Sequence, residues 1–190
     1  MLVQLVISTI ERYVGLTAAE RECIAARWHE HAFSKGASIC RAGEVEQRFY
    51  IVESGVQRMS FPHDGEDVCV GFSYGHSWCG AFDSFVSRKP SRFDVVALTD
   101  TVLVGIEYAD LQTLFATVPP MERWGRLILE ELVVGRATRE IEQLSLTAEQ
   151  RYERLVARSP QLLQLVPQKD IASYLRMKPE TLSRLRARRS

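Results

Sequence analysis

The residues best suited to chemistry lie in the C-terminal segment 166–190, which is rich in arginine and lysine. An arginine guanidinium can hold a guanine edge through two hydrogen bonds, and a glutamate can accept from the amino group of cytosine. Lysine and arginine also neutralise phosphates, which gives affinity without sequence preference. We therefore expect this segment to contact double-stranded DNA. The predicted contact residues are Lys169, Lys178, Glu180, Thr181, Arg184, Arg186, Arg188 and Arg189.

The apolar spacing of the same segment predicts a helix-turn-helix. The positions expected to face inward are Ile171, Ala172 and Leu175 in the first helix and Leu182 and Leu185 in the second, with Met177 between them. Pro179 suits the first position of the second helix, because its missing N–H has no partner there. Arg176 occupies the turn position that usually holds glycine, where a left-handed backbone costs a non-glycine residue roughly 1 kcal/mol.

The charge distribution supports a nucleic-acid partner for this segment. The chain of 190 residues carries 24 basic and 24 acidic residues, so its net charge is zero. Segment 166–190 holds seven basic and two acidic residues, or +5, which leaves −5 on the preceding 165 residues. Such an asymmetry favours an anionic polymer as partner. The alternative is a solvated basic helix without a ligand.

The rest of the chain offers no catalytic set, so we expect no enzyme activity. His29 and His31 could place two ligands on one side of a strand, but no third ligand lies nearby, and we expect neither a metal nor a cofactor. The four cysteines, at positions 23, 40, 69 and 79, show no metal-binding spacing. Cys40, Cys69 and Cys79 fall in expected strands as small apolar side chains, and a redox role for them stays open.

No apolar run approaches the roughly 18 residues that cross a bilayer, and the N-terminus lacks the features of a secretory signal. A cytoplasmic protein is therefore expected.

The elements that must position the basic segment follow from periodicity. Residues 2–28 read as two amphipathic helices, the second capped at Thr17, and residues 31–106 change to period two with frequent turn glycines. Eight short antiparallel strands of this kind predict a jelly roll or a related closed roll. The expected strands are 31–33, 38–41, 49–53, 56–61, 68–72, 77–79, 93–98 and 102–106.

A long helix is expected over 119–145, followed by a supporting helix over 147–158 capped at Thr147. The long helix carries a broad apolar stripe, which either covers the roll or joins two copies of the chain. We expect a homodimer. The predicted interface residues are Trp124, Leu127, Ile128, Val134 and Ile141.

The series Lys35-Gly36, Ile39, Gly43-Glu44, Tyr50-Ile51-Val52 and Ser54-Gly55 resembles the first half of the cyclic-nucleotide-binding roll in the Crp/Fnr regulators. The ending, from Ala148-Glu149-Gln150-Arg151-Tyr152 to Leu182-Ser183-Arg184, is similar to a branch of that family with a minimal DNA-binding domain.

The resemblance implies an α+β chain of three parts: N-terminal helices and roll over 1–118, a dimerisation helix over 119–146 and a helix-turn-helix domain over 147–190. It further implies a homodimeric transcription regulator that acts on DNA with RNA polymerase. By resemblance, Arg184 would read a guanine, Thr181 a base or phosphate, and Glu180 a cytosine. The alternative is a module that binds a cyclic nucleotide or another small anion and acts on a protein partner.

The resemblance also points to an effector pocket that has lost its usual contacts. Its positions are Gly80, Ala81, Phe82, Ser91, Arg92 and Arg136. Ala81 stands where the family has the glutamate that accepts from the ribose, and Ser91 stands where it has the arginine that pairs with the cyclic phosphate. Arg92 should point out of the pocket, because successive strand residues face opposite sides. We therefore expect that cyclic AMP does not bind in the family's usual way.

Overall fold

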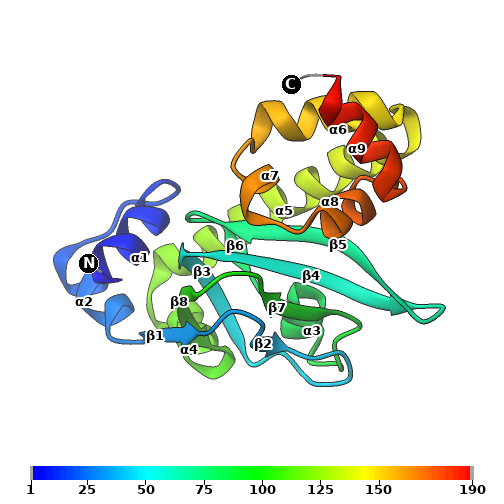
Figure 1. The fold of residues 1–190 in the computed structure, drawn as a ribbon. Coiled ribbons are helices and arrows are strands. Elements are labelled where there is room, and N and C mark those ends of the chain that lie inside the picture. Colours follow the sequence, from blue (N-terminus) through cyan, green and yellow to red (C-terminus); the bar gives the residue numbers. More distant parts are fainter. Residues whose placement is uncertain (1, 189–190) are drawn as a thin grey trace.

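The computed structural model describes residues 2–188 and has the predicted α+β architecture: N-terminal helices, an antiparallel β-roll, a long helix and a small helical domain (Figure 1). The N-terminal and roll elements are α1 (Leu2–Glu11), α2 (Ala18–Ala25), β1 (Trp28–Phe33), β2 (Ser38–Cys40), β3 (Arg48–Ser54), β4 (Val56–His63), β5 (Glu66–Tyr74), β6 (Trp78–Cys79), α3 (Phe82–Ser87), β7 (Asp94–Ala97) and β8 (Thr101–Glu107). The remaining elements are α4 (Tyr108–Thr117), α5 (Pro119–Ser145), α6 (Ala148–Arg158), α7 (Leu162–Leu165), α8 (Gln168–Tyr174) and α9 (Pro179–Ala187).

The roll consists of two four-stranded antiparallel sheets, with strand orders β1-β8-β3-β6 and β2-β7-β4-β5. Their inner faces pack together through buried side chains such as Tyr50 and Leu103 of the first sheet and Val95 of the second. All eight expected strands are present, with ends that differ by up to three residues. The alternation of apolar and polar residues, together with the turn glycines between the strands, therefore located the strands of the roll.

The sequence prediction was wrong at the end of the second helix. Residue Trp28 begins β1, where it pairs with Ile106 of β8, and α2 ends at Ala25. Three further helices, α3, α4 and α7, lie in segments for which no element was expected. α3 and α7 have only six and four residues, too few to show a helical period. Both predicted caps are present, since Thr17 and Thr147 each form a capping box.

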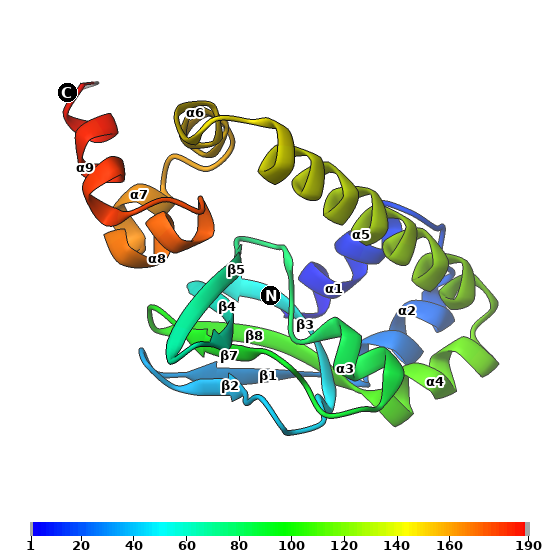
Figure 2. The same ribbon diagram turned by 90° about the vertical axis from the view of Figure 1, so that its right-hand side faces the viewer.

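The largest core cluster joins α1, α2, β3, α4 and the N-terminal half of α5 around Phe49. Trp124 and Ile128 of α5 are 1% and 2% exposed within this cluster, and the rings of Phe49 and Trp124 meet edge to face at 6.1 Å. These two residues were predicted to lie between two copies of the chain. They instead hold the first half of α5 on its own roll and N-terminal helices, so that this half of the stripe covers the core. α1 and α2 lie beside this part of α5 (Figure 2).

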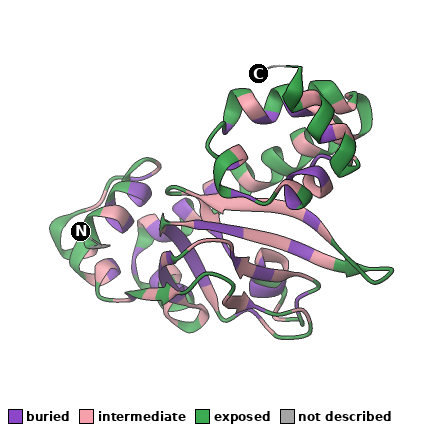
Figure 3. Ribbon diagram, in the orientation of Figure 1, coloured by how far each residue is buried: buried purple, intermediate pink, exposed green. Residues whose placement is uncertain are grey.

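The buried residues concentrate in the strands of the roll and in the inward faces of the helices, whereas α6 and α9 are mostly exposed on their outer faces (Figure 3). Over residues 2–188, no helix combines the length and the apolar character that crossing a membrane requires.

Candidate nucleic-acid interface and effector pocket

Helices α8 and α9 pack at an angle set by a tight left-handed turn. Ile171, Ala172 and Leu182 are fully buried between the helices of this domain. Arg176, at the turn position that usually holds glycine, has a φ of 51° and so adopts the left-handed conformation. The Met177 amide donates to the Ala172 carbonyl at 3.0 Å and closes the turn. α9 then begins at Pro179, as predicted from its missing N–H.

Arg151 of α6 supports this turn and was not singled out from the sequence. Its Nε donates to the Leu175 carbonyl at 2.8 Å, and a second guanidinium nitrogen donates to the Arg176 carbonyl at 3.3 Å. Carbonyls at the end of a helix otherwise lack partners. A cation at this end also opposes the helix dipole. Arg151 therefore offsets part of the strain of a left-handed arginine.

The outward face of α9 presents the predicted contact residues to solvent. Glu180 and Arg184 are exposed and border a shallow groove with Pro179, while Thr181 is half-buried beside them. Arg184 lies within 3.5 Å of the Thr181 hydroxyl. Four further predicted residues are exposed, namely Lys169, Lys178, Arg186 and Arg188, and Arg189 lies outside the described residues. The helix thus displays guanidinium, carboxylate and hydroxyl groups along one accessible face.

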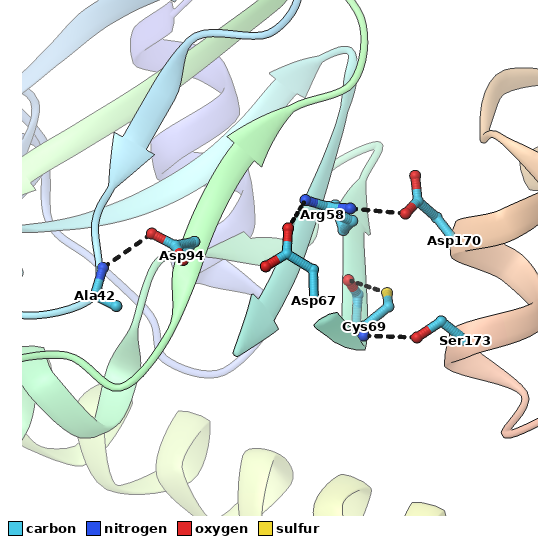
Figure 4. A network of polar contacts seen from close by, with 8 residues as sticks. Ala42, Arg58, Asp67, Cys69, Asp94, Asp170 and Ser173 are labelled. Carbon is cyan, nitrogen blue, oxygen red and sulfur yellow. Dashed lines mark hydrogen bonds and ion pairs between the residues drawn. The ribbon is translucent and has the colours of Figure 1, made fainter. Parts of the chain in front are cut away.

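The helical domain is attached to the roll through α8 and the β4–β5 hairpin (Figure 4). Asp170 accepts from the Arg58 guanidinium at 2.7 Å, and Asp67 lies 3.2 Å from the same guanidinium. The Ser173 hydroxyl accepts from the Cys69 amide at 2.9 Å. The side chains of Arg58 and Asp170 are only 14% and 7% exposed, so the pair is held away from water.

Aromatic side chains extend the same contact. The rings of Phe72 in β5 and Tyr174 in α8 lie 5.2 Å apart, and the Tyr74 hydroxyl hydrogen-bonds to that of Ser159. Val56 of β4 belongs to the core cluster of the helical domain. The sequence carried no signal for this junction, because Arg58 and Asp170 are 112 residues apart and follow no shared period.

At the expected effector pocket, a buried carboxylate, that of Glu46, contacts the backbone of Ala81. Glu46 is 4% exposed. It accepts from the Ala81 amide at 3.3 Å and from the Arg48 amide at 3.2 Å. Burial raises the pKa of this carboxyl, although the two amides act in the opposite direction. Gly80, with a φ of 122°, brings the chain close to Glu46, which lies 3.3 Å from where a Cβ would be. No sequence pattern had marked Glu46.

The remaining pocket residues give no charged contact to the interior. Ser91 is buried and uses its hydroxyl locally, donating to the Phe93 carbonyl at 2.8 Å and accepting from the Phe93 amide at 2.9 Å. Arg92 has a side chain that is 79% exposed and lies 3.4 Å from Asp83. Arg136 is exposed on α5. Phe82 packs against Phe49 at 5.3 Å in the neighbouring core.

The side chain of Arg88 makes its contacts within the chain. Its guanidinium donates to the Glu46 carbonyl at 2.7 Å and lies 4.2 Å from the centre of the Tyr108 ring.

Burial lowers the reactivity of the three cysteine thiols in the strands. Cys40, Cys69 and Cys79 are buried in the roll, as predicted. Burial raises the pKa of each thiol to about 12, and the nearby Glu46 carboxylate adds to the effect at Cys40 and Cys79. Because the thiolate is the reactive form, these thiols are poor nucleophiles at neutral pH.

The exposed part of α5 carries an apolar surface. Val133 and Val134 are each 65% exposed, Ile141 is 64% exposed and Leu144 is 78% exposed. Leu129 continues the stripe and lines an apolar groove of about 740 Å³ between α3, α4 and α5. Of the predicted interface residues, Val134 and Ile141 belong to this surface, Leu127 is half-buried, and Trp124 and Ile128 are buried.

Residues 30–118 match the family model of the cyclic nucleotide-binding domain. The roll has the cyclic nucleotide-binding-domain fold. Solved structures share this fold and the elements that follow it. No curated protein sequence matches the chain.

Three of these structures illustrate the likeness. The catabolite activator protein of Thermus thermophilus is 21% identical, with a TM-score of 0.58 over 91% of this chain and 83% of that chain. The regulator CLP of Xanthomonas campestris is 17% identical, with a TM-score of 0.66 over 90% and 91% of the two chains. FixK2 of Bradyrhizobium japonicum is 20% identical, with a TM-score of 0.69 over 85% and 83%. At such identities the likeness establishes the fold.

The Arg58–Asp170 pair predicts a measurable coupling between the roll and the helical domain. Removing one partner leaves the other charge buried, so Arg58→Met and Asp170→Asn should each lower the free energy of unfolding by about 3 kcal/mol. The double variant should lose about 1–3 kcal/mol less than the sum of the two. Denaturant unfolding of the three variants measures both values.

Arg21→Met is the matched control, because Arg21 forms an ion pair of the same length, 2.7 Å, with Glu11 on the surface. This control should cost at most about 1 kcal/mol. If the double variant lost as much free energy of unfolding as the two single variants added together, Arg58 and Asp170 would not be coupled.

Proposed function

We propose that this chain is a DNA-binding transcription regulator of Crp/Fnr type and not an enzyme. The observation that carries the proposal is the exposed face of α9, where Arg184, Thr181 and Glu180 stand together on a helix held by buried contacts. A second helix presented in this way enters the major groove of DNA. The fold likeness adds support, since the Xanthomonas campestris neighbour is described as a global regulator that links cell–cell signalling to virulence gene expression.

The roles of the exposed residues follow from their chemistry. Arg184 is the base reader, because a guanidinium makes two hydrogen bonds with a guanine edge. Thr181 contacts a base or a phosphate, and Glu180 accepts from a cytosine. Lys169, Lys178, Arg186 and Arg188 contribute phosphate contacts, which position the helix without reading sequence.

A homodimer through the second half of α5 completes the proposal. The apolar residues of α5 from Leu129 to Leu144, together with the adjoining groove, are left exposed by the described part of the chain. A second copy related by a two-fold axis brings the same residues against them. Two copies of α9 then face half-sites about 34 Å apart, one turn of DNA.

We also propose that the roll works without cyclic AMP. A cyclic phosphate that approached the Ala81 amide would meet the buried carboxylate of Glu46, which already accepts from that amide. At position 91, where the resemblance implies an arginine that pairs with the cyclic phosphate, this chain has a serine, whose hydroxyl donates to the Phe93 carbonyl. An unpaired charge in a desolvated site is strongly disfavoured.

Substitution of Arg184 tests the base contact. Arg184→Ala should weaken binding to the preferred DNA site by about 1–3 kcal/mol and relax one base position. Lys178→Ala is the control, because the loss of a phosphate contact should weaken binding to all DNA sequences alike. It should also make the affinity less dependent on salt concentration. Fluorescence anisotropy on specific and random duplexes measures both. Equal losses on the two duplexes for Arg184→Ala would show that it does not read a base.

Charge placed on the α5 stripe tests the dimer. Val134→Glu combined with Ile141→Glu should give monomers, because both positions are exposed in the single chain and would meet their copies across the two-fold axis. Val3→Glu, which changes a valine that is 56% exposed on α1, should leave the dimer intact. Sedimentation velocity at micromolar concentration distinguishes these states. A wild-type monomer, or an unchanged double variant, would contradict the interface.

Calorimetric titration tests the closed effector pocket. Cyclic AMP and cyclic GMP should each bind with a dissociation constant weaker than about 10 µM, because the charged contacts are missing and Glu46 occupies the amide. A tighter constant for either nucleotide would show that Glu46 moves aside and that the pocket functions.

A further inference from the structure

A second cavity, unrelated to the effector pocket, lies where the roll, α5 and the helical domain meet. It has a volume of about 180 Å³ and is bounded by the aromatic rings of Phe72, Tyr74 and Tyr174. Gly135 and Arg139 line it from α5, and Arg158 lines it from α6. β5, α5 and the helical domain each contribute to its wall, so anything bound there touches all three.

The charges around this cavity are unbalanced. Arg139 lies with its guanidinium 3.9 Å from the centre of the Tyr174 ring, and Arg158 donates to the Tyr174 hydroxyl at 3.0 Å. Among the described residues that line the cavity none is acidic. Among the described residues that line the adjoining hollow, Glu142 is the one carboxylate beside Arg139, Arg158 and two further arginines, Arg151 and Arg154. Burial lowers the pKa of Arg139, and the guanidinium groups of Arg158 and Arg176 act in the same direction, whereas Tyr174 and Cys69 oppose the shift.

On the side of this cavity, where none of the described residues in the wall is acidic, a guanidinium favours an anion that takes two hydrogen bonds from its fork, such as a phosphate. The volume limits its size, because sites for drug-sized ligands have roughly 300–1,000 Å³. A cavity of about 180 Å³ is therefore too small for a nucleotide and suits a compact oxyanion. The Tyr174 ring completes the site, since its face already holds the Arg139 guanidinium in place.

We propose that this cavity binds a small phosphate-type anion, either inorganic phosphate or a compact phosphomonoester, between Arg139 and Arg158. The anion neutralises the two arginines that line the cavity, Arg139 from α5 and Arg158 from α6. It thereby ties α5 and the helical domain together beside β5. This site does not depend on DNA binding, and its test needs no DNA.

The test is isothermal titration of the full chain with inorganic phosphate and, separately, with glycerol phosphate, against sodium chloride at equal ionic strength. Arg139→Gln should weaken binding at least about tenfold, since it removes a charge-assisted pair of hydrogen bonds. Arg136→Gln is the matched control, because Arg136 is an exposed arginine three residues earlier on the same helix. It should bind as the wild type does.

A second variant keeps both arginines and fills the space. A Cβ on Gly135 would meet no atom within 4 Å, so Gly135→Leu should place its side chain in the cavity and displace the anion. Leucine also favours a helix interior over glycine, so the fold should be retained. The proposal is supported if both Arg139→Gln and Gly135→Leu lose binding that Arg136→Gln keeps.

Which of the two ligands binds more tightly identifies the source of the phosphate group. The proposal is overturned if neither anion binds the wild type below about 10 mM, a free energy of only some 3 kcal/mol. Binding that Arg136→Gln loses to the same extent as Arg139→Gln would place the anion on general surface charge and overturn it as well. If Arg139→Gln fails to fold, the Gly135→Leu variant decides alone. Anion binding by Gly135→Leu that equals binding by the wild type would then overturn the proposal.

Discussion

The position of the helical domain depends on one buried ion pair, Arg58 with Asp170. Burying two charges costs several kcal/mol per ion, and a pair at 2.7 Å recovers this only where the remaining groups are also satisfied. Asp67 accepts from the same guanidinium at 3.2 Å, whereas Arg58 Nε is buried with no hydrogen-bond partner among the described residues. Such a pair contributes more to defining one arrangement than to stability. It directs α8 against β5, which leaves α9 on the outside of the molecule.

The long helix has two parts with different tasks. Its first half is fixed by Trp124 and Ile128 in the core, and its second half is exposed and apolar from Leu129 onward. The rigid first half sets the direction of the second, and so the angle at which two copies would meet. In the expected effector pocket, the buried Glu46 carboxylate accepts from the amides of Arg48 and Ala81.

Patterns local in the chain predicted most of the fold. Alternating residues located all eight strands, and the spacing of Ile171, Ala172 and Leu182 located the two helices of the basic segment. The left-handed conformation of Arg176 followed from its place in the turn. These features depend on neighbours within a few positions, and a sequence displays such neighbours directly.

The features that the sequence did not reveal are contacts between distant residues. An apolar stripe looks the same whether it meets its own core or another copy, so Trp124 and Ile128 were assigned to the wrong surface. Arg58 with Asp170, and Glu46 with Ala81, join residues 112 and 35 positions apart without a shared period. No pattern in the sequence marked Glu46, and only the fold shows that it accepts from the amides of Arg48 and Ala81.

The central claim is that two copies of α9 read one DNA site together. Sequencing of fragments that the full chain selects from a random DNA library tests it most directly. The account predicts an enriched pseudo-palindrome whose half-site centres lie about 10 base pairs, or one helical turn, apart. Fragments with no common motif, or with one unpaired half-site, would contradict it.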